Sequence, residues 1–274
     1  MQHGTDILEL ANGLKARGEA FALATVVRTV AATAAKAGAK AVIRADGSIS
    51  AGWIGGGCAR GAVLKAAREA LADGQARLVS VQPADVLAEQ GLHPGDARDG
   101  VQFARNMCPS HGTMDVFVEP VLPRPGVLVC GGSPVAVAVA ELAARFGFFV
   151  AVAAAEADQD RFAEPDLRLD GFDLAALPAV KFAVVATQGR GDEAALKAAV
   201  NGVSGYIAFV GSHRKAAALR EALAAEGVDP ERLARVRAPA GLDIGAVTPE
   251  EIALSIVAEM VEVRRRGQIV LAAR

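Results

Sequence analysis

The fold of the C-terminal half is decided by the stretch Val127-Leu128-Val129-Cys130-Gly131-Gly132-Ser133-Pro134-Val135-Ala136. Its first four residues are wholly apolar and predict a buried strand over 127–130. The glycines predict a tight turn, and an apolar helix is expected to follow as far as Arg145. A second strand is predicted over 148–153. A strand, a glycine turn, a helix and a second strand form the opening unit of a doubly wound parallel sheet.

This turn matches the dinucleotide-binding fingerprint only in part. Gly131 supplies the tight turn, but Ser133 replaces the second glycine. The acidic residue that normally grips the ribose is missing at the end of the second strand, where three alanines occupy 153–155. The nearest acidic residues that could bind the ribose are Glu156 and Asp158, which follow the expected position. We therefore expect NAD to bind poorly in the usual manner, whereas another nucleotide or a phosphate can still bind at this turn.

The alternation of strands and helices continues, with further strands predicted over 181–186 and 206–210 and with Asp192 expected to cap the helix over 193–200. In an open α/β sheet, ligands bind at the carboxyl ends of the strands. The candidate binding residues at this edge are Gly131, Gly132, Ser133, Pro134, Gln188, Arg190, Gly211, Ser212, Arg214 and Lys215. The cations among them can meet an anionic ligand, and the alternative is that they are solvated residues at helix starts.

A second glycine turn organises the N-terminal half, Gly52-Trp53-Ile54-Gly55-Gly56-Gly57-Cys58. Strands are predicted upstream, over 21–30, 40–44 and 48–51, and a helix downstream, over 58–72. Backbone N–H groups at glycines can approach a ligand closely, and a helix N-terminus favours an anion. A thiol at that position has a lowered pKa. We therefore expect Gly55, Gly56 and Gly57 to bind a phosphate-bearing ligand and Cys58 to carry a reactive sulfur; the alternative is a tight turn before a buried small residue.

The region over 83–109 shows little periodicity and is predicted as a long loop, which is usually functional in a compact domain. It ends near Cys108 and His111, whose spacing of three is seen in metal sites. Two ligands do not complete a structural zinc site, which needs four. A loop cysteine beside a ligand site is the favoured interpretation of Cys108, with metal binding as the alternative. A strand over 113–119 follows.

Prolines at 120, 123 and 125 together with Gly126 predict a linker. The predicted organisation is therefore an α+β domain over 1–119, a linker over 120–126 and a Rossmann-like domain over 127–274. The last helix is expected to begin with Thr248 as N-cap, Pro249 at the first position and Glu251 at the third. Its apolar stripe, in either the core or a subunit interface, consists of Ile252, Ile256, Met260 and Val263.

Composition excludes several classes of protein. The 274 residues are 52% hydrophobic and 22% charged, with a net charge of −2, which is typical of a globular chain and not of a disordered one. Nothing suggests a basic nucleic-acid surface or a membrane span. The three cysteines are widely spaced and odd in number, which argues for a reducing compartment. Without a basic and apolar leader at the N-terminus, we expect a cytoplasmic protein.

Several motifs together resemble one family, the XdhC/CoxI family. They are the Gly-Gly-Gly-Cys turn at 55–58, Gly-Thr-Met-x-Val-x-x-Glu-Pro at 112–120, Gly-Gly-x-Pro-Val-Ala at 131–136, Gly-Ser-x-Arg-Lys at 211–215 and Gly-Leu-Asp-Ile-Gly-Ala-x-Thr-Pro-Glu-Glu-Ile-Ala at 241–253. The form around Cys108 is closer to the carbon monoxide dehydrogenase branch. Members of this family are accessory proteins for molybdenum hydroxylases such as xanthine dehydrogenase and carbon monoxide dehydrogenase.

The resemblance implies a function and a set of partners. The chain would bind the molybdenum cofactor, as molybdopterin or its cytidine dinucleotide form, support its sulfuration and insert it into an apo molybdenum hydroxylase. It would act as a homodimer, with a cysteine desulfurase as a further partner. Cys58 would be the catalytic residue and a molybdenum ligand, Cys108 would be a second candidate metal ligand, and Asp243 would join the cofactor-binding residues.

The sequence also departs from the family pattern. The family often has Gly-Ser-x-Pro-Arg where 32–36 stands here, Cys-Gly-Gly where 110–112 stands, and His at Gln188. The Gly-Gly-Gly-Cys turn at 55–58 is intact. Two other functions stay open: an NAD(P)-dependent oxidoreductase that uses the C-terminal domain, and a protein-interaction scaffold. The missing acid and Ser133 weigh against the oxidoreductase.

Overall fold

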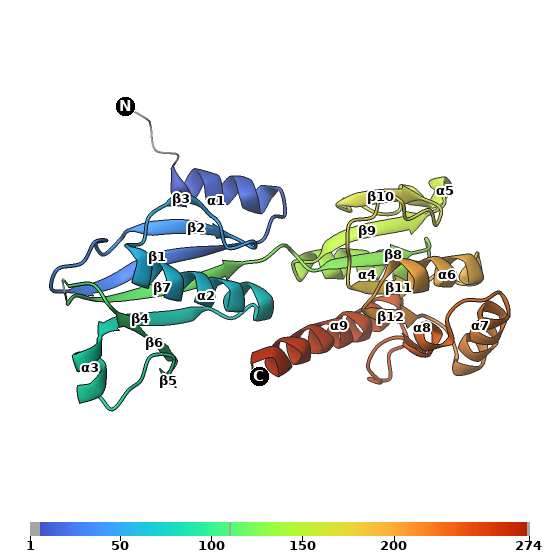
Figure 1. Cartoon of the computed structure of the whole chain (residues 1–274). Helices are drawn as coiled ribbons and strands as arrows, with labels where there is room; N and C mark the ends of the chain where they lie inside the picture. The colour runs from blue at the N-terminus through green and yellow to red at the C-terminus, as the bar shows by residue number, and fades with distance from the viewer. Residues whose placement is uncertain (1–5, 110, 273–274) are drawn as a thin grey trace. The chain divides into compact units, whose positions relative to one another are not determined.

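The computed structural model describes residues 6–109 and 111–272, with side chains given for these residues except Cys58 and 267–272 (Figure 1). The chain divides into two compact units, and the division falls between Pro123 and Arg124. We call them the N-terminal unit (6–123) and the C-terminal unit (124–269) and describe each by itself.

The N-terminal unit is built on a sheet whose described strands follow the order β3-β2-β1-β7-β4-β6-β5. Neighbouring strands are antiparallel except β4 and β6, which are parallel. The elements are α1 (Ile7–Ala16), β1 (Phe21–Val30), β2 (Lys40–Arg44), β3 (Ile49–Gly52), α2 (Gly57–Asp73), β4 (Arg77–Pro83), α3 (Ala84–Glu89), β5 (Ala97–Arg98), β6 (Val101–Asn106) and β7 (Thr113–Val121). The predicted strands before the glycine turn at 52–58 and the predicted helix after it are confirmed.

Helix α2 covers one face of this sheet because its small apolar side chains allow a close approach. Val63, Ala66, Ala67 and Ala70 are buried against alternate residues of the strands. Along β7 the inward residues are Met114, Val116 and Val118, as the period of two predicts. Gly74 ends the helix in the left-handed conformation, with φ of 74°. This packing fixes where the N-terminus of α2 lies, immediately behind the glycine turn.

The prediction of a long loop over 83–109 is wrong. This region forms α3, β5 and β6, and β6 pairs in parallel with β4 from Leu78↔Val101 to Pro83↔Asn106. Leu87, Leu92 and Phe103 form a small core under it. The elements escaped prediction because α3 has six residues and β6 is mostly only half-buried, so neither carries a clear period.

The predicted linker over 120–126 is longer than the connection observed. Strand β7 continues through Pro120, which lies opposite Ala22 of β1. Strand β4 pairs with β7 only as far as Val118, so β7 is an edge on that side at Pro120, and proline is tolerated at strand edges. Residues 122–125 alone connect β7 to the next strand.

The C-terminal unit is a doubly wound sheet in which all described strands are parallel, in the order β10-β9-β8-β11-β12-β13. Its elements are β8 (Gly126–Cys130), α4 (Pro134–Arg145), β9 (Phe149–Ala154), α5 (Glu156–Gln159), β10 (Leu167–Asp170), β11 (Phe182–Val185), α6 (Asp192–Gly202), β12 (Tyr206–Phe209), α7 (His213–Ala225), α8 (Pro230–Ala234), β13 (Val236–Arg237) and α9 (Pro249–Ala272). This order is the Rossmann arrangement, with its switch point between β8 and β11. The predicted Rossmann-like fold is confirmed.

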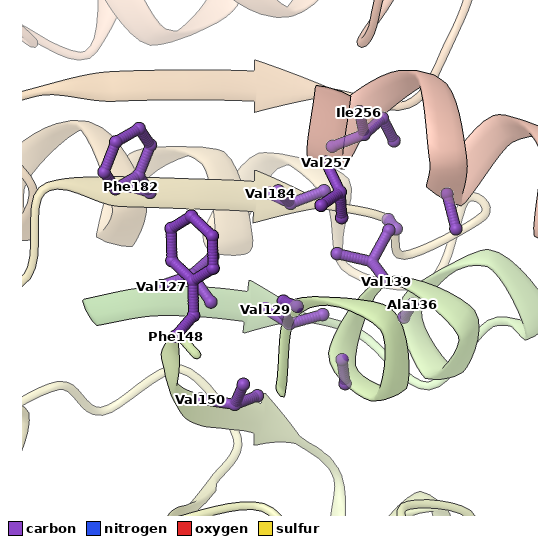
Figure 2. Packing of buried hydrophobic residues seen from close by; sticks show 14 of the residues in the cluster. Val127, Val129, Ala136, Val139, Phe148, Val150, Phe182, Val184, Ile256 and Val257 are labelled. Atoms are coloured by element: carbon purple, nitrogen blue, oxygen red, sulfur yellow. The ribbon is translucent and has the colours of Figure 1, made fainter. Parts of the chain in front are cut away.

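Helices cover both faces of the parallel sheet. On one face α4 and α9 enclose a core that includes Val127, Val129, Phe148 and Val184 (Figure 2). On the other face α6 and α7 pack against Leu128, Cys130 and their neighbours. The apolar stripe of α9 belongs to the first core, where Ile256 and Met260 are fully buried. The stripe is therefore a core element of this unit.

Candidate functional site

A cavity of about 300 Å³ lies at the start of α2 in the N-terminal unit. Three segments that are distant in sequence form it, namely 33–35, the glycine turn, and the chain from Asn106 to Gly112. Its described lining residues are Thr33, Ala34, Ala35, Gly55, Gly56, Gly57, Ala59, Val81, Asn106, Met107, Cys108, Gly112 and Met114. The structure thus brings the predicted residues Gly55, Gly56, Gly57 and Cys108 together around one space.

The N-terminus of α2 opens toward this cavity without a cap. Gly56 is the N-cap residue and has no side chain to bond the first N–H groups, and the first turn holds no acidic residue. No side chain among the described residues caps these N–H groups, so together with the positive end of the helix dipole they can bind an anion. Cys58 is the second residue of α2, in that first turn; its side chain lies outside the described part of the chain.

The glycine turn is held by close packing. Gly55 has a φ of +114°, and a Cβ there would lie 3.3 Å from Cε of Met114. Gly56 and Gly57 face open space instead, because a Cβ at either would meet no heavy atom within 4 Å. Gly55 thus shapes the turn, whereas Gly56 and Gly57 leave room for a ligand.

Asn106 fixes the opposite wall of the cavity. Its side-chain Nδ2 donates to the carbonyl oxygen of Gly112 at 2.6 Å, and its Oδ1 accepts from the N–H of Cys108 at 2.9 Å. Gly112 in turn lies against the backbone at 32, where an added Cβ would come within 2.2 Å of the Ala32 oxygen. Cys108 is therefore carried on a loop whose two ends are tied together.

The chemistry of the lining is neutral. None of the described lining residues carries a charged side chain, and most are glycine, alanine, valine or methionine. Such a surface accommodates an uncharged ring, while the N-terminus of α2 can meet a negative group at its edge. Two thiol-bearing residues, Cys58 and Cys108, belong to these same segments.

The spacing of Cys108 and His111 suggested a metal pair. Within the residues that the structure describes, no three His, Cys, Asp or Glu side chains gather in a way that could hold a metal ion. His111 has a positive φ of 46° and an exposed side chain. Cys108 lines the cavity at the start of α2, and both its role beside a ligand and its metal binding stay predictions.

The second group of predicted residues lies at the carboxyl edge of the parallel sheet, in the C-terminal unit. Gly131 has a φ of +102°, and a Cβ there would lie 2.7 Å from Cα of Thr187, so the turn after β8 packs directly on the end of β11. The donors of this turn are partly used or missing. Ser133 Oγ accepts from the N–H of Ala136 at 3.2 Å, and Pro134 at the start of α4 has no N–H.

Asp158 lies against the same turn. A Cβ built on Gly132 would come within 2.4 Å of Cβ of Asp158, so the two residues are in contact. The Asp158 carboxylate is 3.4 Å from Nη1 of Arg161 and 4.0 Å from Nη1 of Arg190. The predicted binding cation Arg190 thus has an internal partner from the segment after β9.

Asp192 does not cap α6 through its side chain, which corrects the prediction. Gly191 is the N-cap, and the Asp192 carboxylate accepts instead from Gly189 N–H at 2.9 Å and from the Thr187 hydroxyl, and forms an ion pair with Lys215. Burial raises the pKa of Asp192, but the bonds from Lys215, Thr187 and Gly189 outweigh burial and hold it below its usual value. The Lys215 ammonium is therefore paired with Asp192 within the protein.

The remaining predicted residues of this edge are placed as follows. Ser212 is the N-cap of α7 and accepts from the N–H of Lys215 at 3.3 Å. Gln188 is exposed and has a φ of +53°, and Arg214 and Asp243 are also exposed. Asp243 lies on the loop between β13 and α9. Gln188 follows the carboxyl end of β11, and Ser212 and Arg214 follow that of β12; their part in ligand binding stays a prediction.

Two features were missed in the sequence. The first is Asn106, which holds the cavity wall. It could have been recognised because an Asn side chain often bonds the backbone N–H two residues later, and Asn106 stands two residues before Cys108. Glu259, almost fully buried in α9, accepts from the Tyr206 hydroxyl at 2.6 Å and from Arg237 at 2.5 Å. An acid within the apolar stripe of a predicted helix was the available signal for that network.

Comparison with known proteins gives matches over both units. Residues 127–260 match the XdhC Rossmann domain, and residues 14–82 match the XdhC and CoxI family. The chain is 32% identical over 257 residues to the uncharacterised protein YqeB of Escherichia coli (strain K12), covering 90% of this chain and 44% of that protein. It is 31% identical over 167 residues to a probable xanthine dehydrogenase subunit of Bacillus subtilis (strain 168), covering 58% of this chain and 48% of that protein.

The chain spans less than half the length of these curated relatives. A crystal structure of a xanthine dehydrogenase from Bacillus halodurans is similar with a TM-score of 0.46 and 19% identity, covering 94% of this chain and 96% of that one. Among the helices described, none is long and apolar enough to cross a membrane.

Proposed function

Because the chain belongs to the XdhC and CoxI family, we propose that it is an accessory protein that binds the molybdenum cofactor and delivers it to a molybdenum hydroxylase such as xanthine dehydrogenase or carbon monoxide dehydrogenase. The cavity at the start of α2 is the single observation that carries this proposal. It combines neutral walls, an uncapped helix N-terminus and thiol-bearing segments in one unit.

These three properties fit the chemistry of the cofactor. A pterin with a dithiolene group needs a neutral surface for its ring, an anion site for its phosphate, and a soft environment for its metal. At about 300 Å³, the cavity is at the small end of ligand pockets, which are about 300–1,000 Å³. The ring end would therefore enter the cavity, and a nucleotide tail would extend outside it.

Different residues of the cavity would have different roles in binding the cofactor. Gly56 and Gly57 would present backbone N–H groups to the phosphate, and Asn106 would hold the wall that carries Cys108. Cys58, in the first turn of α2, would be the reactive thiol that takes part in sulfuration, because a helix N-terminus stabilises a thiolate. When bound, the cofactor supplies the metal that the hydroxylase uses. A cysteine desulfurase would supply the sulfur, and the active form would be a homodimer.

The NAD(P)-dependent oxidoreductase is less well supported. In the C-terminal unit Ser133 bonds its own helix, Pro134 lacks a donor and Asp158 contacts Gly132. Of the N–H groups that a diphosphate could use at this turn, that of Ala136 is already bonded by Ser133 and Pro134 has none.

The full chain, produced in a host supplied with molybdate, tests the proposal through its molybdenum content and its pterin fluorescence after oxidation. We expect stoichiometric molybdenum and pterin in the wild type and a loss of at least tenfold in Cys58→Ser. Cys130→Ala is the matched control, because burial raises the pKa of Cys130 to about 12 and removes it from thiolate chemistry. Wild-type protein without molybdenum or pterin, or equal loading in both variants, would contradict the proposed site.

A further inference from the structure

The loop between β13 and α9 is held rigidly although it is mostly exposed. Gly241 N–H donates to the buried Glu259 at 3.0 Å, and Leu242 N–H donates to the carbonyl oxygen of Ser255 at 3.2 Å. At its other end, the Glu251 carboxylate accepts from the N–H groups of Val247 and Thr248 at 2.8 and 2.9 Å. Both ends of the loop are therefore fixed to the N-terminal half of α9.

The loop also lies close against the helix. Gly241 has a φ of +90°, and a Cβ there would come within 2.2 Å of Oγ of Ser255. From Thr248 to Ser255 the helix rises by about 10 Å, at 1.5 Å per residue. Both anchors of the loop therefore lie within this short length of α9, which keeps the side chains between Gly241 and Thr248 near it.

Apolar side chains gather in that region. Val247 is 82% exposed and Ile244 is 53% exposed, and Leu242 and Leu254 are also large exposed hydrophobic residues. We call these four residues the apolar loop patch. Single exposed hydrophobic residues are ordinary on a protein surface. Four of them on a backbone that hydrogen bonds hold in place indicate a surface that another molecule covers.

Charge indicates what kind of molecule fits. Between 238 and 263 the sequence contains no Lys or Arg, and three exposed carboxylates, Asp243, Glu250 and Glu251, lie on the loop and in the first turn of α9. Arg145 of α4 shares a groove with Glu250, and Glu141 lies in the same groove. The surroundings of the apolar loop patch are therefore acidic. In a symmetric contact between two copies, the same acidic surface would face itself, which like charges disfavour.

We propose that the apolar loop patch docks a different protein, one that presents an apolar surface rimmed by Lys and Arg. This inference rests on the proposed function in one respect, namely that the protein to be probed is the apo molybdenum hydroxylase of the same organism. The patch lies in the C-terminal unit and contains no residue of the cavity at α2. Docking and cofactor retention can therefore be separated by mutation.

The experiment measures the affinity of the full chain for this apo-hydroxylase by interferometry at low and high salt. The loop variant is Ile244→Ser/Val247→Ser, and the matched control is Leu8→Ser, which removes an equally exposed leucine from α1. We expect the loop variant to bind at least tenfold more weakly with unchanged molybdenum content and unfolding temperature, and the control to stay within twofold. Glu250→Lys should weaken binding and reduce its dependence on salt.

Unchanged affinity in the loop variant would overturn the inference. So would a change in the mass of the chain itself by light scattering, because that would identify a second copy as the occupant. If the wild type carries molybdenum and binds the hydroxylase but the loop variant binds equally well, the docking inference alone fails. If the wild type neither carries molybdenum nor binds, the proposed function fails with it.

Discussion

Asn106 and Gly112 are joined by a hydrogen bond of 2.6 Å, from Nδ2 of the asparagine to the carbonyl oxygen of the glycine. The bond closes the loop that carries Cys108, and the same asparagine also accepts from the Cys108 N–H. One side chain thus sets the position of the wall that faces the N-terminus of α2.

Replacing Asn106 with alanine is expected to loosen this wall. Two hydrogen bonds are lost, each worth about 0.5–1.5 kcal/mol, so the free energy of unfolding should fall by about 1–3 kcal/mol. Molybdenum retention should fall with it, because Cys108 is no longer held. Denaturant titration and metal analysis measure the two effects. The control is Asn201→Ala, at an exposed position in α6, which should change neither the stability nor the molybdenum content. If Asn106→Ala retained as much molybdenum as the wild type, the segment from Asn106 to Gly112 would have no part in cofactor binding.

The glycines around the cavity should separate stability from binding. Gly112→Ala would place a Cβ 2.2 Å from the Ala32 oxygen, which forces the backbone to shift and should cost about 2 kcal/mol or more in stability. Gly57→Ala meets no atom within 4 Å and removes a flexible residue from the helix start, so it should be neutral or stabilising by up to about 1 kcal/mol.

Gly57→Ala should nonetheless retain less cofactor, because its methyl group occupies the approach to the N–H groups of α2. Thermal unfolding and molybdenum content, measured on both variants, test this pair of expectations. Full metal loading in a stable Gly57→Ala protein would show that the phosphate does not approach α2 at this residue.

The sequence predicted most of what surrounds these glycines, because the signals there are local. The alternation of apolar and polar residues along β7 was sufficient to predict that strand, and the glycine after α2 was sufficient to predict where the helix ends. Strand β6 was missed because its partner β4 lies on the far side of α3 and β5 in the chain, and its half-buried residues carry no period. The 33–35 segment of the cavity was missed for a related reason, since its proximity to Gly55 is a tertiary fact that no local pattern records.

Asp192 gives a prediction about pH. The bonds from Lys215, Thr187 and Gly189 hold its folded-state pKa below the ordinary value of 3.8. A carboxyl with a depressed folded pKa contributes stability above its unfolded pKa, and that stability is lost as the pH falls through the folded pKa. Asp192→Asn should therefore be less stable than the wild type at pH 7, and the difference should shrink below about pH 4.

Denaturant unfolding at neutral pH and at successive steps of acidification measures this effect. Asp160→Asn, which removes an exposed carboxylate, provides the baseline for a general change in charge. A stability difference for Asp192→Asn that stays the same from neutral to strongly acidic pH would mean that the carboxylate contributes no charge-dependent stability.

The last prediction concerns dinucleotides at the C-terminal turn. Ala155 stands where a ribose-binding acid is expected, Pro134 lacks an N–H group, and Asp158 contacts Gly132. A hydrogen bond to a charged group is worth about 1.5–3 kcal/mol, so loss of the ribose acceptor alone should weaken NADH by about tenfold to a hundredfold relative to an ordinary Rossmann site. Calorimetric titration with NADH should therefore detect no micromolar binding. Ala155→Asp restores an acid at an exposed N-cap position before α5 and should strengthen NADH binding if the turn itself accepts the diphosphate. Micromolar binding by the wild type, followed by hydride transfer to an acceptor, would favour the oxidoreductase over the cofactor carrier.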